Sequence, residues 1–177
     1  MSFFGEVRQL GYVVRDIEAA MAFWRNVMKV GPFFHFAKAP VGDFKYRGEP
    51  TDAQVSVALA NCGALQIELI QPLDDHPTPY RDFLKKGQEG MHHVAFWSET
   101  FAQDLERAEA AGFELVLSGY AVQKDGLFAY FDDSASPHPG AMVELSALTG
   151  AKKETFELVK NVSLAWNGTD PIRRMDA

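Results

Sequence analysis

Four polar residues recur at matched places in this sequence, and their side chains have the chemistry of a divalent metal site. Gln9 and His93 stand in strand-like stretches, and Glu68 and Glu144 lie in the later stretches LQIELIQ and AMVELSAL. Because side chains on a strand alternate between two faces, these four residues point away from the apolar neighbours that would face helices. We therefore expect an amide, an imidazole and two carboxylates on the same face of a sheet.

Two carboxylates on a concave, buried face would each cost several kcal/mol unless a cation lies between them. A divalent ion neutralises both, and three oxygens with one nitrogen suit a hard or borderline ion in octahedral geometry. Mg²⁺, Mn²⁺, Co²⁺, Ni²⁺ and Zn²⁺ all fit. Cys62 is the single cysteine, so neither a Cys-rich zinc site nor an internal disulfide is possible. The sequence thus predicts one divalent ion held by Gln9, Glu68, His93 and Glu144.

The elements that must position these residues occur twice. A strand over 6–14 and a cap at Asp16 precede a helix over 17–28, and a strand over 90–97 precedes a helix over 101–111. Three strand-like stretches follow each helix, at 42–47, 54–60 and 65–71 and then at 113–119, 128–132 and 141–148. This internal repeat predicts an α+β fold in which two tandem βαβββ modules form a curved, eight-stranded mixed sheet.

The repeat also predicts how the chain is divided. Residues 1–75 form the first module, 76–148 a linker with the second module, and 149–177 a C-terminal helical extension. The extension contains an amphipathic helix over 151–166, followed by a tail whose turn chemistry predicts a loosely held segment.

Composition limits the class of partner. The chain has 177 residues, a net charge of −7 and 47% hydrophobic residues, as expected for a folded globular protein. An acidic surface disfavours nucleic acid, and no apolar run is long enough for a membrane span. The N-terminus lacks the pattern of a signal peptide, so we expect a cytoplasmic protein whose partner is a small-molecule substrate.

Aromatic residues make up 12% of the chain, and each ring belongs either to the core or to a pocket. Trp97 shares a strand face with His93, so it is predicted to line the pocket, together with Phe44, Tyr46 and Phe128. His92 alternates to the opposite face and is interpreted as structural. Three further histidines fall in loop-like contexts that favour a solvated imidazole: His35, His76 and His138.

The strings QLGYVVRDIEAAMAFW, LQIELIQPLDD, GMHHVAFW and AMVELSAL resemble the vicinal oxygen chelate superfamily, which includes glyoxalase I, methylmalonyl-CoA epimerase and the extradiol dioxygenases. The resemblance covers about residues 6–148, and residues 68–97 are most similar to the methylmalonyl-CoA epimerases. It implies that Gln9, Glu68, His93 and Glu144 are the metal ligands. The epimerases more usually have His and Gln at the first two positions, whereas this set resembles eukaryotic glyoxalase I.

The resemblance implies a metal-dependent lyase, isomerase or epimerase of the glyoxalase or methylmalonyl-CoA epimerase type, and a homodimer. The ion would polarise a carbonyl of a small carbonyl or thioester substrate and stabilise the enolate formed by loss of a neighbouring proton. Glu68 and Glu144 are candidate bases by similarity to glyoxalase I, and Glu49 and Asp52 lie in a loop comparable to that of the epimerases.

Two other functions are compatible with the same fold. Bleomycin-resistance relatives bind a planar drug between aromatic rings without a catalytic metal, which makes a non-catalytic binding or resistance protein the main alternative. Extradiol dioxygenases hold Fe²⁺ with two His and one carboxylate, and the single His of this set disfavours that chemistry.

Overall fold

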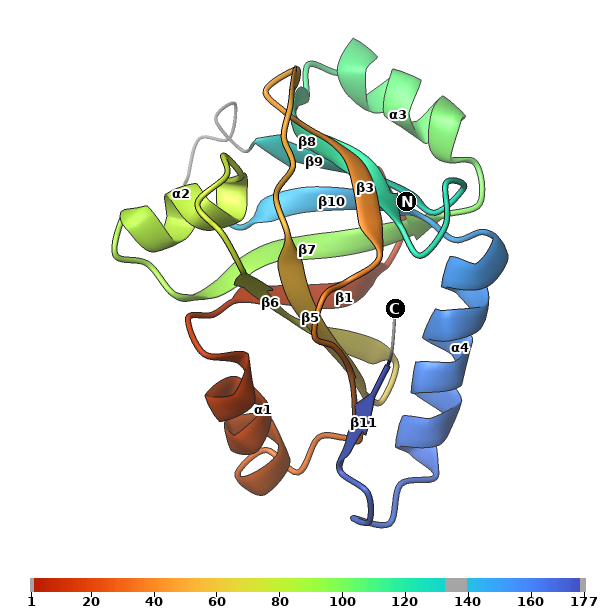
Figure 1. The fold of residues 1–177 in the computed structure, drawn as a ribbon. Helices are drawn as coiled ribbons and strands as arrows, with labels where there is room; N and C mark the ends of the chain where they lie inside the picture. The colour runs from red at the N-terminus through yellow and green to blue at the C-terminus, as the bar shows by residue number, and fades with distance from the viewer. Residues whose placement is uncertain (1, 133–139, 176–177) are drawn as a thin grey trace.

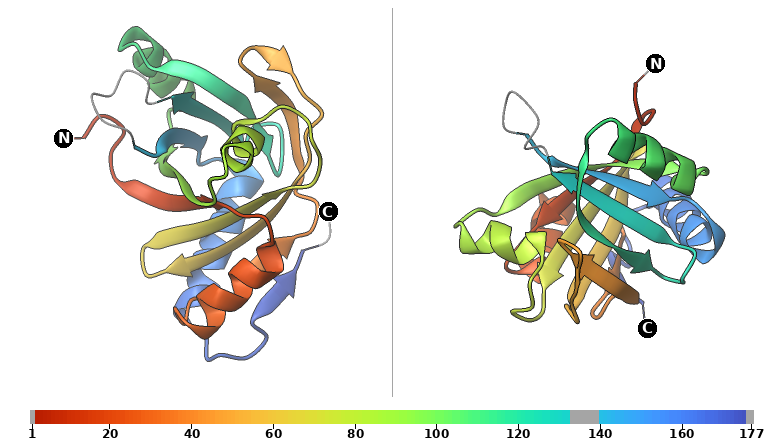
Figure 2. Two further views of the ribbon diagram at one scale, coloured as in Figure 1. Left: turned by 90° about the vertical axis from the view of Figure 1, so that its left-hand side faces the viewer. Right: turned by 90° about the horizontal axis from the view of Figure 1, so that it is seen from above.

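Two strands, β1 (Val7–Val13) and β7 (Gly90–Ser98), lie antiparallel at the centre of the sheet. The computed structural model describes residues 2–132 and 140–175, and it places all strands in one mixed sheet of order β11-β2-β5-β6-β1-β7-β10-β9-β8-β3-β4. Figures 1 and 2 show that this sheet is strongly curled. The curl gives it a concave inner face, as the predicted fold class requires.

The first half of the chain supplies one helix and five further strands. These are α1 (Ile17–Asn26), β2 (Phe33–Phe36), β3 (Val41–Tyr46), β4 (Glu49–Pro50), β5 (Val55–Cys62) and β6 (Leu65–Pro72). β6 pairs in parallel with β1, and β5 pairs antiparallel with β6. The helix begins where predicted, because the Asp16 carboxylate accepts a hydrogen bond from the Ala19 amide at 2.9 Å.

The second half repeats the arrangement of a strand, a helix and further strands after one additional helix, and the chain then continues into a C-terminal extension. Its elements are α2 (Pro79–Lys85), α3 (Phe101–Ala110), β8 (Glu114–Ala121), β9 (Leu127–Asp132), β10 (Met142–Ala147), α4 (Gly150–Leu164) and β11 (Ile172–Arg174). β10 pairs in parallel with β7, as β6 does with β1. None of the helices in the described ranges has an apolar stretch long enough to cross a bilayer.

All eight predicted strands are present, and the structure adds β2, β4 and β11 to reach eleven. It also adds α2, which lies in the segment predicted to be a linker. The signal for this helix is the pair Thr78-Pro79, in which the Thr78 hydroxyl caps the Arg81 amide at 3.1 Å and Pro79 occupies the first turn. The predicted strand number was too small because two of the added strands have only two or three residues.

β3 departs from the simple division into two modules. It belongs to the first half of the sequence, yet it pairs antiparallel with β8 of the second half, from Val41 opposite Ala121 to Tyr46 opposite Leu117. A strand from the first half of the chain therefore extends the sheet beside β8 of the second half. We propose that the boundary at residue 75 separates the two repeated modules in the sequence. In the sheet, β3 of the first module pairs with the second module.

The tail after α4 is held by the sheet, contrary to the expectation of a loose segment. β11 pairs in parallel with β2, and the Met175 amide donates to the His35 carbonyl at 2.8 Å. Arg174 lies 2.8 Å from His35 Nδ1, and Ser56 Oγ lies 2.8 Å from His35 Nε2. His35 is thus buried in β2, and its prediction as a solvated loop residue was wrong.

The remaining two histidines of that group differ from His35. The side chain of His76 is half exposed and lies 3.1 Å from the Asp74 carboxylate, as expected of a loop residue. His138 lies outside the residues that the structure describes.

α4 covers one side of the curled sheet (Figure 1) and buries Lys152, Phe156 and Val159. The Phe156 ring packs on Trp97 of β7 with a centroid distance of 4.8 Å. On the same helix the Ser163 hydroxyl accepts a hydrogen bond from the Asn61 amide at the end of β5. The C-terminal extension is therefore docked on the sheet by both apolar and polar contacts.

The Phe156→Ala variant tests this docking. Phe156 is 7% exposed, and truncating a buried phenylalanine typically costs about 3–5 kcal/mol. The matched control Leu158→Ala removes a side chain of the same helix that is 46% exposed, and we expect it to cost less than about 1 kcal/mol. Urea unfolding followed by circular dichroism measures both values, and equal costs would contradict the packing of α4 described above.

Candidate metal centre

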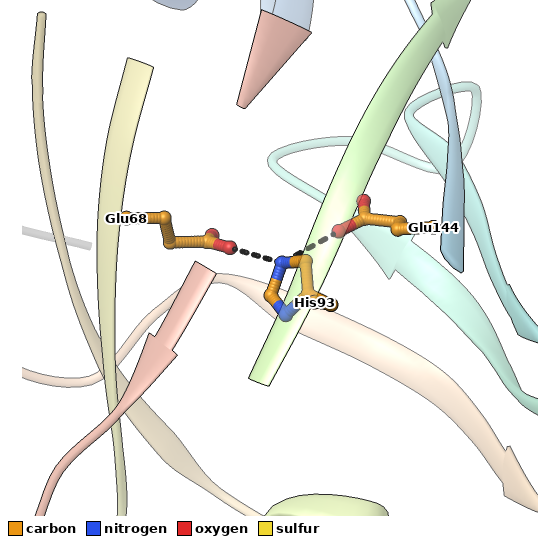
Figure 3. Close-up of side chains that lie close together, drawn as sticks. All are labelled: Glu68, His93 and Glu144. Atoms are coloured by element: carbon orange, nitrogen blue, oxygen red, sulfur yellow. Dashed lines mark ion pairs between the residues drawn. The ribbon is translucent and has the colours of Figure 1, made fainter. Parts of the chain in front are cut away.

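Three of the four predicted ligands converge at one point of the concave face. Glu68 of β6, His93 of β7 and Glu144 of β10 direct their side chains toward one another (Figure 3). His93 Nε2 lies 3.2 Å from Glu68 Oε2 and 3.2 Å from Glu144 Oε2. One ligand atom from each residue lies within 4.8 Å of the others. Three strands from both halves of the chain thus bring two carboxylates and an imidazole together.

Gly11 of β1 makes this convergence possible. It lies opposite Glu68 on one side and opposite His93 on the other. The imidazole of His93 lies over Gly11, where a Cβ would collide with Cε1, Nε2 and Nδ1 of the ring. Sequence reasoning missed this role, although a glycine inside a strand is a signal for close approach of another group.

Gln9 lies two residues before Gly11 on the same face of β1. It is 2% exposed, and its Nε2 donates to Gln66 Oε1 at 2.7 Å. This bond leaves the amide oxygen of Gln9 as its atom for a metal. Gln9 lines the same pocket as Glu68 and Glu144.

His92 does not point away from the centre as strand alternation predicted. In the pairing of β1 with β7, Gly11 lies opposite His93 and Tyr12 lies opposite Met91, so His92 is passed over as a β-bulge. The bulge places His92 Nδ1 3.2 Å from His93 Nδ1. His92 is therefore a partner that orients the ring of the candidate ligand and leaves its Nε2 toward the carboxylates.

The pKa values of the ionisable side chains in the centre depend on burial and on one another. Burial lowers the pKa of His93, but its hydrogen bonds to Glu144 and Glu68 outweigh this and raise the pKa to about 9. Burial raises the pKa of Glu144, but its hydrogen bond to His93 and the positive charge of His93 bring the pKa below its usual value. Burial raises the pKa of Glu68 above its usual value. Burial, followed by repulsion from His93, lowers the pKa of His92 to about 3.

These residues fit a divalent ion. With a protonated His93 the three side chains carry a net charge of −1, whereas a divalent ion with a neutral imidazole brings the sum to zero. Glu68 Oε2 is fully buried, and apart from its 3.2 Å ion-pair contact with His93 Nε2 it makes no hydrogen bond of good geometry, so it has capacity for a ligand bond. Two carboxylates, an imidazole and an amide oxygen are ligands that Mg²⁺, Mn²⁺, Co²⁺, Ni²⁺ and Zn²⁺ accept.

The centre lies in a largely apolar pocket on the inner face of the sheet. Phe44 of β3 and Phe128 of β9 line it, and their rings meet edge to face at 5.5 Å. Other aliphatic or aromatic residues of the wall are Phe36, Ala39, Pro40, Val41, Val55, Val57, Leu59, Ile70, Tyr80, Ala121, Val122, Tyr130 and Phe156. An apolar wall of this kind limits the access of water to the carboxylates that line the pocket.

Two predicted pocket residues do not line this pocket. Trp97 packs between Phe156 and the guanidinium of Arg8, which lies 4.9 Å from its ring centroid. Tyr46 donates a hydrogen bond from its hydroxyl to Asp82 of α2 at 2.6 Å. Both residues lie on strands of the sheet, but Trp97 is covered by α4 and Tyr46 contacts α2. A sequence pattern does not reveal which helix covers which end of a strand.

Two loop carboxylates proposed as bases are also absent from the pocket. Glu49 and Asp52 are exposed and do not line it. The polar side chains of Tyr80, Tyr130 and Lys152 also line it, and neither Tyr80 nor Lys152 was singled out from the sequence. The Tyr130 hydroxyl lies 3.4 Å from His93 Nε2 and also hydrogen bonds to Glu144. Its position two residues after Phe128 on one strand was the available signal.

The fold and this centre agree with the comparison to known families. The profile of the Glyoxalase/Bleomycin resistance protein/Dioxygenase superfamily matches residues 8–131. The chain belongs to this superfamily. Its match covers β1 to β9 and ends before β10 and α4, so the extension lies outside the matched region.

Two curated proteins are similar to part of this chain, and one of them has a named activity. An uncharacterized protein of Bacillus subtilis, YqjC, is 26% identical over 107 residues, which are 60% of this chain and 67% of the relative. The mitochondrial methylmalonyl-CoA epimerase of Bos taurus is 35% identical over 94 residues, 51% of this chain and 45% of that enzyme. The chain thus matches less than half the length of the bovine protein.

Solved structures share the superfamily fold. Methylmalonyl-CoA epimerase from Mycobacterium tuberculosis has a TM-score of 0.60 at 16% identity, covering 87% of this chain and 95% of the other. A hypothetical protein from Bacillus halodurans C-125 has a TM-score of 0.60 at 18% identity, covering 82% and 95%. At these identities the likeness concerns the fold alone.

The Gly11→Ala variant tests the geometry of the centre. The added methyl group would displace the His93 ring, so we expect Co²⁺ affinity to fall at least about 10-fold, since a small displacement of one ligand disturbs the whole set. Titration calorimetry measures the affinity, and circular dichroism checks that the variant folds. A folded variant with unchanged Co²⁺ affinity would mean that the ring position does not matter for the metal.

The raised pKa of His93 predicts how stability depends on pH. For a histidine whose folded pKa, about 9, exceeds its unfolded value of 6.5, the stabilisation is fully present below pH 6.5 and disappears as pH rises through 9. The Tm of metal-free protein should therefore fall by several degrees between these values, measured by differential scanning calorimetry. The His93→Asn variant should lose this dependence, and an equal fall in that variant would exclude His93 as its source.

Proposed function

We propose that this protein is a divalent-metal-dependent epimerase, isomerase or lyase acting on a small carbonyl or thioester substrate through an enolate. The observation that carries the proposal is the convergence of Glu68, His93 and Glu144 within 4.8 Å at an apolar pocket. Structural sites can also bury charged residues, but here the buried Glu68 Oε2 has only its 3.2 Å ion-pair contact with His93 Nε2 and no hydrogen bond of good geometry. An unsatisfied ligand atom facing a pocket favours a functional site over a structural one.

The division of roles follows from the positions of the side chains. Gln9, Glu68, His93 and Glu144 would hold the ion, and His92 keeps the His93 ring oriented through its 3.2 Å contact. The ion would polarise a substrate carbonyl and so lower the energy of the enolate. The aromatic and aliphatic wall keeps water away from the carbon that loses its proton.

Glu68 is the carboxylate better placed to act as the base. Its side chain is 15% exposed, against 7% for Glu144, and its buried oxygen has only the ion-pair contact with His93. Glu144 is held by His93 and by the Tyr130 hydroxyl, which favours a fixed position. We infer that Glu68 takes the proton from the substrate carbon and returns it, while Glu144 remains a ligand.

The comparisons suggest which substrate to test. The bovine relative is a methylmalonyl-CoA epimerase, and a solved epimerase of the same fold was determined with methylmalonyl-CoA. We propose a CoA thioester of this type as the substrate to examine, and the hemithioacetal of methylglyoxal as the next, because the ligand set resembles glyoxalase I. The exposed Lys38 lies next to Ala39 and Pro40 of the pocket wall and is available to a phosphate.

We also infer a homodimer, as the resemblance to the superfamily implies. Each chain contains all four proposed ligands, and Glu68 and Glu144 come from strands of the two halves. A partner subunit is therefore not required to complete the site.

The decisive experiment follows deuterium from the solvent into the acidic carbon of methylmalonyl-CoA by NMR. We expect the wild type to hold about one divalent ion per chain by elemental analysis and to catalyse exchange. Glu68→Gln keeps an oxygen ligand but cannot accept a proton, so exchange should fall at least about 100-fold with metal content retained. Glu49→Gln makes the same chemical change at an exposed carboxylate and should leave exchange unaffected.

Two outcomes would contradict the proposal. Purified protein without stoichiometric metal, together with a Glu144→Ala variant that binds small ligands as the wild type does, would favour a non-catalytic binding protein. Undiminished exchange in Glu68→Gln would exclude Glu68 as the base. Exchange with the hemithioacetal but not with the thioester would keep the mechanism and change the substrate.

A further inference from the structure

We infer that the pocket selects a substrate that carries a carboxylate in addition to its metal-chelating oxygens. We infer that Lys152 of α4 binds this carboxylate. The inference rests on the proposed function for the position of the metal-binding end of the substrate. It adds a recognition site at the other end of the same pocket.

Lys152 is a buried cation that no carboxylate contacts directly in the described part of the chain. It is 3% exposed and lines the pocket. Its Nζ donates to three neutral oxygens: Ser146 Oγ at 2.5 Å, the Leu127 carbonyl at 3.2 Å and the Gly126 carbonyl at 3.4 Å. Among residues 2–132 and 140–175, no carboxylate lies within 4.0 Å of this ammonium group. A lysine that only anchored a helix to a strand would more usually keep its charged end in water.

The longest of these bonds leaves room for a ligand. The 3.4 Å contact of Nζ with the Gly126 carbonyl is weak because of its length, and this carbonyl also accepts a hydrogen bond from the Ala121 amide at 2.9 Å. An ammonium group has three donors, and Ser146 and Leu127 occupy two of them. The third donor makes only the weak contact with the Gly126 carbonyl, and a stronger acceptor in the pocket would replace it.

The charge balance explains why that acceptor is expected to be an anion. Burial lowers the pKa of Lys152, and attraction to Glu144 and Glu68 opposes the change, so these carboxylates are the groups that stabilise its charge. A divalent ion on Glu68 and Glu144 would neutralise them and leave the buried ammonium uncompensated. A carboxylate of the substrate would then supply the missing negative charge.

Strand geometry sets the distance between the two ends of such a substrate. Glu144 and Ser146 lie two residues apart on the same face of β10, which is about 7 Å along a strand. Lys152 donates to Ser146, so its ammonium lies roughly one such step from the metal centre. The substrate would carry its carboxylate only a few bonds from its chelating oxygens, which is too close for the phosphates of a CoA chain.

The residue comes from the extension, outside the region matched by the superfamily profile. The walls around it are aromatic, since Nζ lies 5.8 Å from the ring centroids of both Phe128 and Phe156. Apolar surroundings strengthen an ion pair and disfavour a neutral ligand that leaves the ammonium unpaired. Lys152 is therefore a specificity-determining residue of this chain.

Two small acids of matched shape test the inference. Both 2-oxoglutarate and 2-oxopentanoate offer the same chelating 2-oxo-carboxylate, but only 2-oxoglutarate has a carboxylate at the far end. With Co²⁺-loaded wild type we expect 2-oxoglutarate to bind at least about 10-fold more tightly by titration calorimetry. In Lys152→Met, which keeps the length of the side chain and removes its charge, the ratio of the two affinities should fall to near one.

Ser146→Ala serves as the matched control, because it removes a partner of Lys152 and keeps the charge, so most of the preference should persist. Equal affinities in the wild type, or an unchanged preference in Lys152→Met, would overturn the role of Lys152. If Lys152→Met is unfolded by circular dichroism, Lys152→Gln replaces it, and the wild-type comparison still decides. A wild type that binds no Co²⁺ contradicts the proposed function, whereas one that binds Co²⁺ and both acids equally contradicts this inference alone.

Discussion

The interior of this protein depends on how two buried carboxylates are balanced. Glu68 and Glu144 both lie within 3.2 Å of one imidazole nitrogen, in a pocket whose wall is largely apolar. Burying charge in this way is costly unless opposite charge is present at the same place. In the metal-free protein the imidazolium of His93 supplies part of it, and a divalent ion would supply all of it. Folding, pH dependence and chemistry are therefore connected at a single point.

The sheet departs from regular strand geometry where it serves this point. Gly11 removes a side chain so that an imidazole can lie over the central strand, and the bulge at His92 turns a second imidazole toward the first. Each departure has a local cost, since glycine weakens a strand and a bulge interrupts its hydrogen bonds. Their position beside the carboxylates indicates that these costs are tolerated because they place His93 between Glu68 and Glu144.

The C-terminal extension changes a shared fold into a particular pocket. The superfamily match ends at residue 131, yet α4 contributes Lys152, Thr155 and Phe156 to the pocket wall. One face of a single helix thereby adds an apolar surface and a cation beside a site that otherwise contains carboxylates. Because α4 is anchored by Phe156 on Trp97 and by Ser163 on Asn61, the ammonium is held in place. Selectivity and stability of this region are expected to change together.

The sequence by itself determined the repeat, the eight core strands and the residues that meet at the centre, because alternation along a strand is a local property. It did not determine that β3 crosses to β8, that β11 joins β2, or that helices cover Trp97 and Tyr46. It also did not predict that Lys152 is buried or that a β-bulge directs the His92 side chain toward His93. These features depend on which distant strand provides each hydrogen-bonding edge and on the curl of the sheet. Only the tertiary structure decides such pairings, since residues far apart in the chain compete for the same edges and surfaces.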